Sequence, residues 1–214
     1  MHKILKSIQL AGLLTLIGFA TGCVPYNKVI LQSGTLAFLK QQSAVNVRYD
    51  YEGLQVGTPN HSVTEQWHID KKVASRNEKT AGTGESWRQE WLGNRTSRYQ
   101  PKFEAMLNKQ AGVTIFGQHP DAPYTLILKI AYLEPGYNVG VSAKPSCLNG
   151  DATFIETKSP ANNLATLSLV NMMGLDAWGF TYDETYRIDL AYTMAGRQLG
   201  AFIKSKAKHK DKIQ

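Results

Sequence analysis

Residues 124–133, Tyr-Thr-Leu-Ile-Leu-Lys-Ile-Ala-Tyr-Leu, are the stretch of this 214-residue chain that decides the fold. Leu126, Leu128 and Ile130 fall on one side of an extended chain, and Ile127 and Ala131 fall on the other. A strand that is apolar on both sides is typical of the centre of a sheet that is covered on both faces. We therefore expect 124–133 to be a central strand with a layer on each face.

Further strands flank this stretch. Val45 to Tyr51 alternates apolar and polar residues, which predicts a half-buried first strand. Val113 to Phe116 is a short candidate. Residues 152–157 and 165–172 indicate two more strands, joined by the turn-rich segment 158–163. Because consecutive strands joined by short turns pair antiparallel, we expect a mostly antiparallel sheet.

A helical insertion interrupts the strands over about 62–111. Ser62 followed by Glu65 has the pattern of a capping box and predicts a helix from Val63 to about residue 79. The segment 81–84, Ala-Gly-Thr-Gly, breaks it, and a second helix is expected from about residue 85. Pro101 predicts a restart of the helix, and Gly112 a stop.

The C-terminal segment carries two periodicities. Tyr186 to Met194 alternates as a strand does, but a helical stripe continues to Ile203 and basic residues follow it. We therefore expect a helix over about 183–207, with Asp183 as its N-cap and with Gly196 and Gly200 allowing close packing on the sheet. The predicted fold is a single α+β domain over residues 43–208.

The first 22 residues have the pattern of a lipoprotein signal peptide. Lys3 and Lys6 precede an apolar run over 8–20 that is too short to span a bilayer, and Ala-Thr-Gly leads into Cys23. We expect cleavage before Cys23, lipidation of its thiol, and a tether over residues 23–42. Val24 indicates the outer membrane, with the domain facing the periplasm. The alternative is an ordinary signal peptide in which Cys23 is incidental.

Charge and cysteine content narrow the function. The net charge is +7, and removing Lys3 and Lys6 leaves +5, of which five lysines and one aspartate near the C-terminus account for +4. A neutral body with a basic tail over 209–214 does not predict nucleic-acid binding. This tail is either a solvated helix end or a contact for anionic lipid. With Cys23 lipidated, Cys147 has no intramolecular partner, and we interpret it as a buried structural thiol.

Motifs that carry chemistry are lacking. The sequence contains no G-x-S-x-G, P-loop or H-E-x-x-H motif. His61 and His68 could share a helix face, but no further ligands have metal-site spacing. We therefore predict no enzymatic activity, no metal and no cofactor.

Candidate binding residues are aromatic. Trp87 and Trp91 are interleaved with Arg88, Arg95 and Arg98, which indicates either a partner-binding face or an aromatic anchor that holds the insertion on the sheet. Exposed loops supply four more candidates, which are Tyr137, Asn138, Trp178 and Phe180.

Several motifs between Gly34 and Lys208 resemble an uncharacterised family of lipoproteins from Gram-negative bacteria. They include Val47-Arg-Tyr-Asp-Tyr51, Glu85-Ser-Trp87, Tyr132-Leu-Glu-Pro-Gly-Tyr-Asn-Val-Gly140 and Ala195-Gly196 with Leu199-Gly200. The resemblance implies no activity and supports a C-terminal helix. The order of strands and helices is also similar, in topology alone, to the N-terminal domain of TolB.

The leading hypothesis is a membrane-anchored envelope lipoprotein that binds a protein or an amphiphile without catalysis. One alternative is a periplasmic hydrolase, which would need a pocket that joins His119 to Asp176 or Asp183. The other is a structural subunit of an envelope complex, which would show a wide apolar patch on the sheet. The sequence leaves the oligomeric state open.

Overall fold

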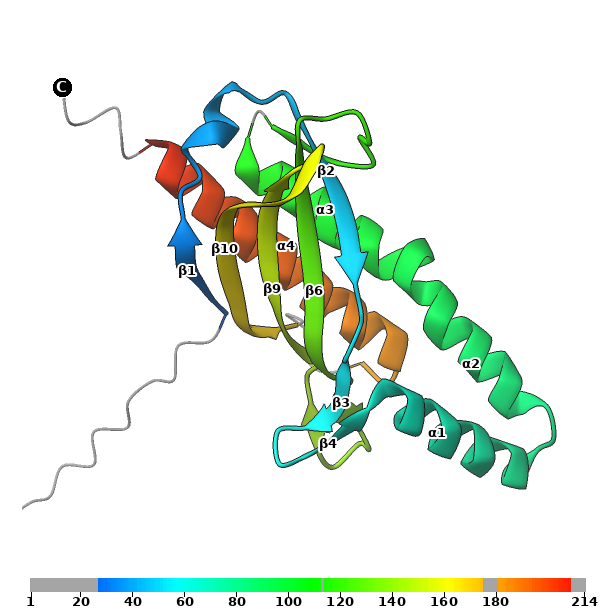
Figure 1. The fold of residues 1–214 in the computed structure, drawn as a ribbon. Helices are drawn as coiled ribbons and strands as arrows, with labels where there is room; N and C mark the ends of the chain where they lie inside the picture. The colour runs from blue at the N-terminus through cyan, green and yellow to red at the C-terminus, as the bar shows by residue number, and fades with distance from the viewer. Residues whose placement is uncertain (1–26, 113, 175–180, 209–214) are drawn as a thin grey trace, which may run out of the picture.

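The computed structural model describes residues 27–112, 114–174 and 181–208. They form an α+β domain in which a large, mostly antiparallel sheet is covered on one face by two long helices, while a helical hairpin extends to the side (Figure 1). The predicted fold class, with its helical insertion and C-terminal helix, is confirmed.

The eight-stranded sheet is built around β6 (Tyr124–Glu134), β9 (Cys147–Glu156) and β10 (Ser159–Met173), and its main order is β1-β10-β9-β6-β2-β5. The strands β1 (Lys28–Gly34), β10, β9 and β6 pair antiparallel with one another in this order. On the other side of β6, the strands β2 (Ala44–Asp50), β3 (Gln55–Thr58) and β5 (Ile115–Gly117) join the sheet in parallel pairs.

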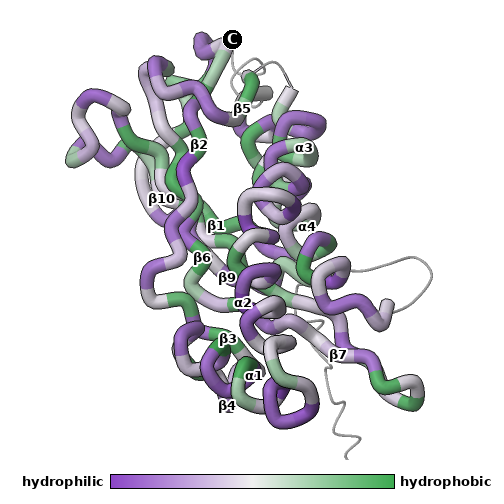
Figure 2. The backbone as a smooth tube through the Cα atoms, turned by 90° about the vertical axis from the view of Figure 1, so that its right-hand side faces the viewer, coloured by the Kyte–Doolittle hydropathy of each residue, from purple (hydrophilic) through white to green (hydrophobic). Residues whose placement is uncertain are grey.

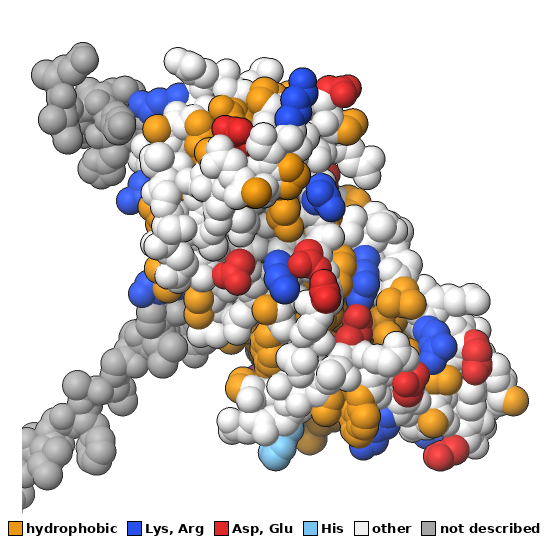
Figure 3. Space-filling model, viewed as in Figure 1, with side chains coloured by type: hydrophobic (Ala, Val, Ile, Leu, Met, Phe, Trp, Pro, Cys, Tyr) orange, Lys and Arg blue, Asp and Glu red, His pale blue; other side chains and the backbone are white. Residues whose placement is uncertain are grey.

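The central position of β6 is confirmed, but the expectation of a layer on both faces is wrong. Leu126, Leu128 and Ile130 are fully buried under the helices. On the opposite face Ile127 is only half-buried, and Lys129 and Ala131 are exposed. The apolar residues on that face are few and small, and the neighbouring strands place polar side chains beside them. Figure 3 shows this open face, with basic and acidic side chains adjacent across its middle.

The domain begins earlier than the sequence predicts. Lys28–Gly34 forms the edge strand β1, which pairs with β10, and Ala37–Gln41 forms a 3-10 turn, η1, that buries Leu39. Residues 28–41 therefore belong to the folded domain, and the expected tether over 23–42 is shorter by this segment. The moderately polar sequence of β1 suits an edge strand, because one side of such a strand faces solvent.

The helical insertion begins after a β-hairpin that the sequence pattern did not predict. β3 and β4 (His61–Thr64) pair across the turn at Pro59 and Asn60. The helix α1 (Glu65–Lys79) then starts at Thr64, whose hydroxyl accepts a hydrogen bond from the backbone N–H of Trp67. The capping box predicted at Ser62 is therefore wrong by two residues, since Ser62 lies in a strand.

The next two helices form one continuous rod. The helix α2 (Thr83–Asn94) passes through a π-helical turn, η2 (Arg95–Tyr99), into α3 (Gln100–Ala111). The restart predicted at Pro101 does not occur, because this proline lies in the first turn of α3, where a missing N–H costs nothing once the π-turn has shifted the register. The stop at Gly112 is confirmed, with φ of 107°.

The C-terminal helix α4 (Glu184–Lys208) is confirmed, as is its N-cap. The Asp183 carboxylate accepts hydrogen bonds from the backbone N–H groups of Thr185 and Tyr186. The glycines have a different neighbour from the one expected. A Cβ at Gly196 would lie 2.2 Å from the carbonyl oxygen of Phe103, and one at Gly200 would lie 2.7 Å from that of Leu107. These glycines therefore allow α4 to approach α3, not the sheet.

A small second sheet projects from the domain. β7 (Tyr137–Asn138) and β8 (Ala143–Lys144) form a short antiparallel hairpin. Figure 2 shows it extending beyond the helices, with a hydrophobic tip. Among the described residues, no helix is long and apolar enough to cross a membrane.

Candidate functional site

The first turn of α4 connects the two groups of binding residues that the sequence suggested. Asp183, Glu184 and Thr185 line a cleft against α2 on one side of this turn. On the other side, the buried Arg187 reaches the base of the β7–β8 hairpin. The cleft and the hairpin are therefore neighbours on the end of the domain where α4 begins.

Trp87 and Trp91 lie against this cleft, but neither is an exposed binding face. They are 7% and 5% exposed, and their ring centroids are 5.3 Å apart. His68 of α1 packs against both rings. The two tryptophans thus anchor α1 on α2. The expectation that they are buried anchors is right, but their partner is α1 and not the sheet.

The basic partners of the tryptophans also differ from those expected. Lys72 and Arg76 of α1 lie over the Trp87 ring, at 5.9 and 5.7 Å from its centroid. Arg95 instead lies 4.0 Å from the ring centroid of Tyr51. Side chains three and four positions apart share a helix face, so Lys72 and Arg76 follow from the spacing within α1 once the two helices are known to pack together.

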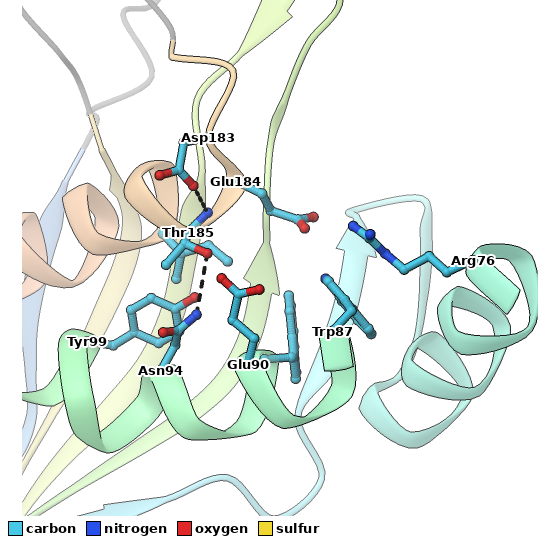
Figure 4. Close-up of a pocket in the computed structure, with 10 residues that line it drawn as sticks. Arg76, Trp87, Glu90, Asn94, Tyr99, Asp183, Glu184 and Thr185 are labelled. Carbon is cyan, nitrogen blue, oxygen red and sulfur yellow. Dashed lines mark hydrogen bonds between the residues drawn. The ribbon is translucent and has the colours of Figure 1, made fainter. Parts of the chain in front are cut away.

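The cleft itself is small, polar and mostly acidic. It has a volume of about 160 Å³. Figure 4 shows the carboxylates of Glu90 and Glu184 pointing into it, and Arg76 reaching toward it from α1. Sites for whole small-molecule ligands are usually about 300–1,000 Å³. This cleft is therefore suited to a single side chain or head group, not to a complete metabolite.

A buried polar network lies behind the cleft. Glu65 pairs with Arg95 from the π-turn and accepts a hydrogen bond of 2.8 Å from the indole N–H of Trp91. Nearby, the rings of Tyr99 and Tyr192 stack at 5.2 Å. Burial raises the pKa of both tyrosines. These phenols stay protonated at neutral pH, so they act as packing groups and not as bases.

The π-turn carries two arginines, Arg95 and Arg98, that pair with carboxylates on other helices. A π-turn inserts one extra residue per turn and so rotates the side chains that follow it. Arg98 from the same turn donates to Asp189 of α4 through Nε at 3.1 Å and Nη2 at 2.6 Å. The sequence signal was the run Arg88, Arg95 and Arg98, but its spacing fits a regular helix and does not reveal the rotation.

The other sequence-predicted residues lie in the hairpin or outside the described residues. Tyr137 and Asn138 form β7, and Tyr137 is 45% exposed. Trp178 and Phe180 lie outside the residues that the structure describes. The exposed Tyr182 lies in the loop over 178–183 that the sequence marked as a candidate contact, although the sequence did not single out this residue.

Arg187 positions this hairpin. Its guanidinium donates to the backbone carbonyls of Pro135 and Gly136 at the base of the hairpin, and to that of Thr181 in the segment before α4. It is only 6% exposed. A buried arginine that satisfies three backbone carbonyls fixes the segments that carry them, and the sequence alone does not show this role.

The chain enters the domain at the same end. The backbone N–H of Asn27 donates to the carbonyl of Asn171, and its side-chain oxygen accepts from the N–H of Met173. The following residue, Gly174, donates to Ser146, which directly precedes β9 and follows the hairpin by two residues. Asn27 is thus joined to the hairpin base through one strand end.

A second cleft, of about 430 Å³, lies at this end on the open side of the sheet and is lined by Tyr132, Glu134, Lys144, Cys147, Asn149, Asn171 and their neighbours. Lys144 pairs with the buried Glu134 at 2.6 Å. Burial raises the pKa of Cys147 to about 11. The thiol is free and buried. The predicted burial of Cys147 is therefore confirmed, and its structural role stays a prediction.

The residues of the proposed hydrolase site are not brought together. His119 and Glu104 both lie near Gly117. Asp183 lies instead beside Thr185, whose hydroxyl is 3.4 Å from Asn94 Nδ2. Ten helical residues separate Asn94 from Glu104, or about 15 Å. Asp176 lies outside the described residues. Within residues 27–112, 114–174 and 181–208, no group of three metal-binding side chains was found.

Comparisons with known proteins identify neither a family nor a function for this chain. No protein-family model matches the chain, and no curated protein is similar to it. Among solved structures, the PelC dodecamer from Paraburkholderia phytofirmans is 13% identical, with a TM-score of 0.37, covering 80% of this chain and 97% of that chain. A point variant of it is 14% identical, with a TM-score of 0.38, covering 80% and 98%. At TM-scores of this size, neither similarity identifies a function.

Proposed function

We propose that this protein is a membrane-anchored lipoprotein of the bacterial cell envelope and acts as a non-enzymatic binding or accessory module. Cleavage before Cys23 and acylation of its thiol would attach the folded domain to the outer membrane on the periplasmic side. The basic start, the short apolar run and the small residues before Cys23 support this proposal. Several acyl chains on one cysteine are sufficient for stable anchoring.

The observation that carries the proposal is the small number of residues between Cys23 and the folded domain. Cys23 precedes Asn27 by four residues, and Asn27 is hydrogen-bonded to β10. Four extended residues span at most about 14 Å. An anchor on Cys23 would therefore keep this end of the sheet, with its hairpin and both clefts, close to the membrane surface.

The basic C-terminal segment is oriented differently. Lys206 of α4 lines a groove with Gly34 and Thr35, at the end of β1 that is opposite Asn27 (Figure 1). Seven strand residues separate the two ends, or about 23 Å. The solvated interpretation of the basic tail is therefore favoured over contact with the membrane that would hold the anchor. Residues 209–214 themselves lie outside the described residues.

Binding is favoured over catalysis by the chemistry of the described clefts. The tyrosines near the first cleft and the thiol in the second have raised pKa values, so neither is activated at neutral pH. The other alternative, a structural subunit of an envelope complex, would need a wide apolar patch on the sheet. The open face of the sheet is instead polar (Figure 3), so this alternative is not favoured.

The test is the fate of the chain when Cys23 is changed. Cys23→Ser should leave the protein unacylated and release it from the membrane fraction, whereas Cys147→Ser, the matched change at the other cysteine, should leave both unchanged. Affinity capture of the acylated protein, followed by mass spectrometry of lipids and proteins, would then identify what it binds. Equal membrane association of the wild type and Cys23→Ser would refute the proposal.

A further inference from the structure

The tip of the β7–β8 hairpin carries two strongly exposed apolar side chains. Val141 is 99% exposed and Val139 is 64% exposed. Tyr182, from the segment before α4, is 74% exposed, and its hydroxyl lies 3.5 Å from the position that a Cβ on Gly140 would occupy. We name these three neighbouring side chains, the two valines and this tyrosine, the hairpin tip.

The hairpin presents these side chains on a defined backbone. The N–H of Val139 donates to the carbonyl of Ser142, and the N–H of Gly140 donates to the side-chain oxygen of Asn138. Gly140 has φ of 84°, which a residue with a side chain adopts only at a cost. The turn thus closes tightly and leaves Val139 and Val141 exposed, and Figure 2 shows that the hairpin ends in hydrophobic residues.

We propose that the hairpin tip inserts into the membrane–water interface beside the lipid anchor. This inference rests on the proposed lipidation of Cys23. It deepens that function by making the membrane surface itself a binding partner of the folded domain, so that the anchor and the hairpin together fix the orientation of the clefts.

Chain connectivity places a bilayer within reach of the tip. Asn27 is joined to Met173, Met173 pairs with Cys147, and Cys147 follows the hairpin by three residues. A segment of four residues from Asn27 to Cys23 spans at most about 14 Å. The anchor would therefore bring the bilayer to the end of the domain from which the hairpin projects.

The chemistry of the hairpin matches the head-group region better than it matches a charged protein surface. Residues 137–144, Tyr-Asn-Val-Gly-Val-Ser-Ala-Lys, contain one charged side chain, Lys144, and it pairs with Glu134 at the base. Tyr137 and Tyr182 combine an apolar ring with a hydroxyl, which is the composition favoured at membrane–water interfaces. An uncharged apolar tip flanked by two tyrosines fits the boundary between head groups and acyl chains.

The test places an environment-sensitive fluorophore on the tip of the full-length, acylated protein. Val141→Cys is labelled with nitrobenzoxadiazole, and Ser205→Cys, an exposed position near the opposite end of α4, is labelled as the matched control. Cys147 is buried and should not react. Both proteins are reconstituted in vesicles of phosphatidylethanolamine and phosphatidylglycerol that contain spin-labelled lipid.

The two labels should behave differently. At position 141 we expect blue-shifted emission and quenching by the spin-labelled lipid, whereas at position 205 we expect the emission and quenching of a probe in water. A second variant, Val139→Asp with Val141→Asp, should fold normally because both side chains are exposed, and should abolish these contacts without releasing the anchored protein. Equal, low quenching at both positions in acylated protein would overturn the proposal, including the case in which the tip instead binds a protein.

A separate measurement distinguishes failure of lipidation at Cys23 from failure of the hairpin tip to insert. The intact mass of each preparation shows whether Cys23 carries acyl chains. If it does not, the proposed function fails, and the same two labels are then measured on the unacylated chain added to preformed vesicles. Quenching at position 141 alone would support membrane insertion of the tip in that chain, and equal low quenching would overturn it.

Discussion

Arg187 Nη2 donates a hydrogen bond of 3.3 Å to the carbonyl oxygen of Gly136, and this contact ties the first turn of α4 to the base of the projecting hairpin. The same guanidinium also binds the carbonyls of Pro135 and Thr181. One buried side chain therefore fixes both segments that form the hairpin tip. The orientation of the tip depends on α4, although the hairpin lies far from α4 in the sequence.

We predict that Arg187→Ala lowers the free energy of unfolding by about 2–4 kcal/mol, because three backbone carbonyls lose a charged donor in a buried position. Amide hydrogen exchange should accelerate most over residues 137–144. The exposed Arg48, changed to alanine, is the control and should alter stability by less than about 0.5 kcal/mol. Unchanged exchange in the hairpin of Arg187→Ala would show that this arginine does not position it.

The contact between α4 and α3 predicts opposite effects for two glycine substitutions in helices. Gly196→Ala places a Cβ 2.2 Å from the Phe103 carbonyl oxygen, so the helices must separate, and we expect a loss of about 2–4 kcal/mol. Gly93→Ala meets nothing within 4 Å, and helix propensity alone should stabilise the protein by about 0.5–1 kcal/mol. Urea unfolding measures both. A neutral Gly196→Ala would contradict the close approach of the two helices.

The Glu65–Arg95 pair should be strongly coupled. Both side chains are largely buried, and Glu65 also accepts from Trp91, so removing either partner leaves a charge without its counterpart. A double-mutant cycle of Glu65→Ala and Arg95→Ala should give a coupling energy of about 1.5–3 kcal/mol. The exposed Asp70–Arg88 pair is the matched comparison, and its cycle should give less than about 1 kcal/mol. Equal coupling in both cycles would show that burial does not strengthen the Glu65–Arg95 pair.

Stability should depend on His68 at mildly acidic pH. Burial lowers its pKa below the usual 6.5, the charge on Lys72 adds to this shift, and the charges on Glu184 and Glu65 oppose it. Because the unfolded chain then binds the proton more readily, the contribution of His68 is intact above about pH 6.5 and declines as the pH falls toward the folded-state pKa. Urea unfolding at pH 7.5 and 5.5 should show a smaller acid-induced loss in His68→Leu than in the wild type. The exposed His61→Gln should match the wild type.

The sequence predicted those features of the fold that depend on local pattern. The strand over 124–133, the helix over 183–207 and the stop at Gly112 follow from periodicity and capping. Features that depend on which other segment a strand or helix packs against were not predictable in this way. β1 has no clear pattern because an edge strand is half-solvated, and the packing of Gly196 on α3 depends on where α4 lies. The open face of β6 shows that an apolar residue can remain uncovered when its neighbours are small or polar.

The candidate site was only partly predictable for the same reason. The sequence marked Trp87 and Trp91 as important but could not tell that α1 would bury them. It marked Tyr137 and Asn138 as loop residues, but it did not predict that they form a β-hairpin with residues 143 and 144. Arg187 escaped notice because its partners are backbone carbonyls, which leave no signature in the sequence. The pairing of Arg95 with Glu65 and of Arg98 with Asp189 required knowledge of the π-turn and of how the helices pack.

The mass of the mature N-terminus tests the central claim most directly. The protein is isolated from the membrane fraction of its bacterial host and digested, and the N-terminal peptide is measured by mass spectrometry. We predict a peptide that begins at Cys23 and carries the added mass of a diacylglyceryl group, with or without a further amide-linked acyl chain. A peptide that retains residues before Cys23, or that begins there with an unmodified thiol, would contradict the claim that the domain is held at the membrane by lipid.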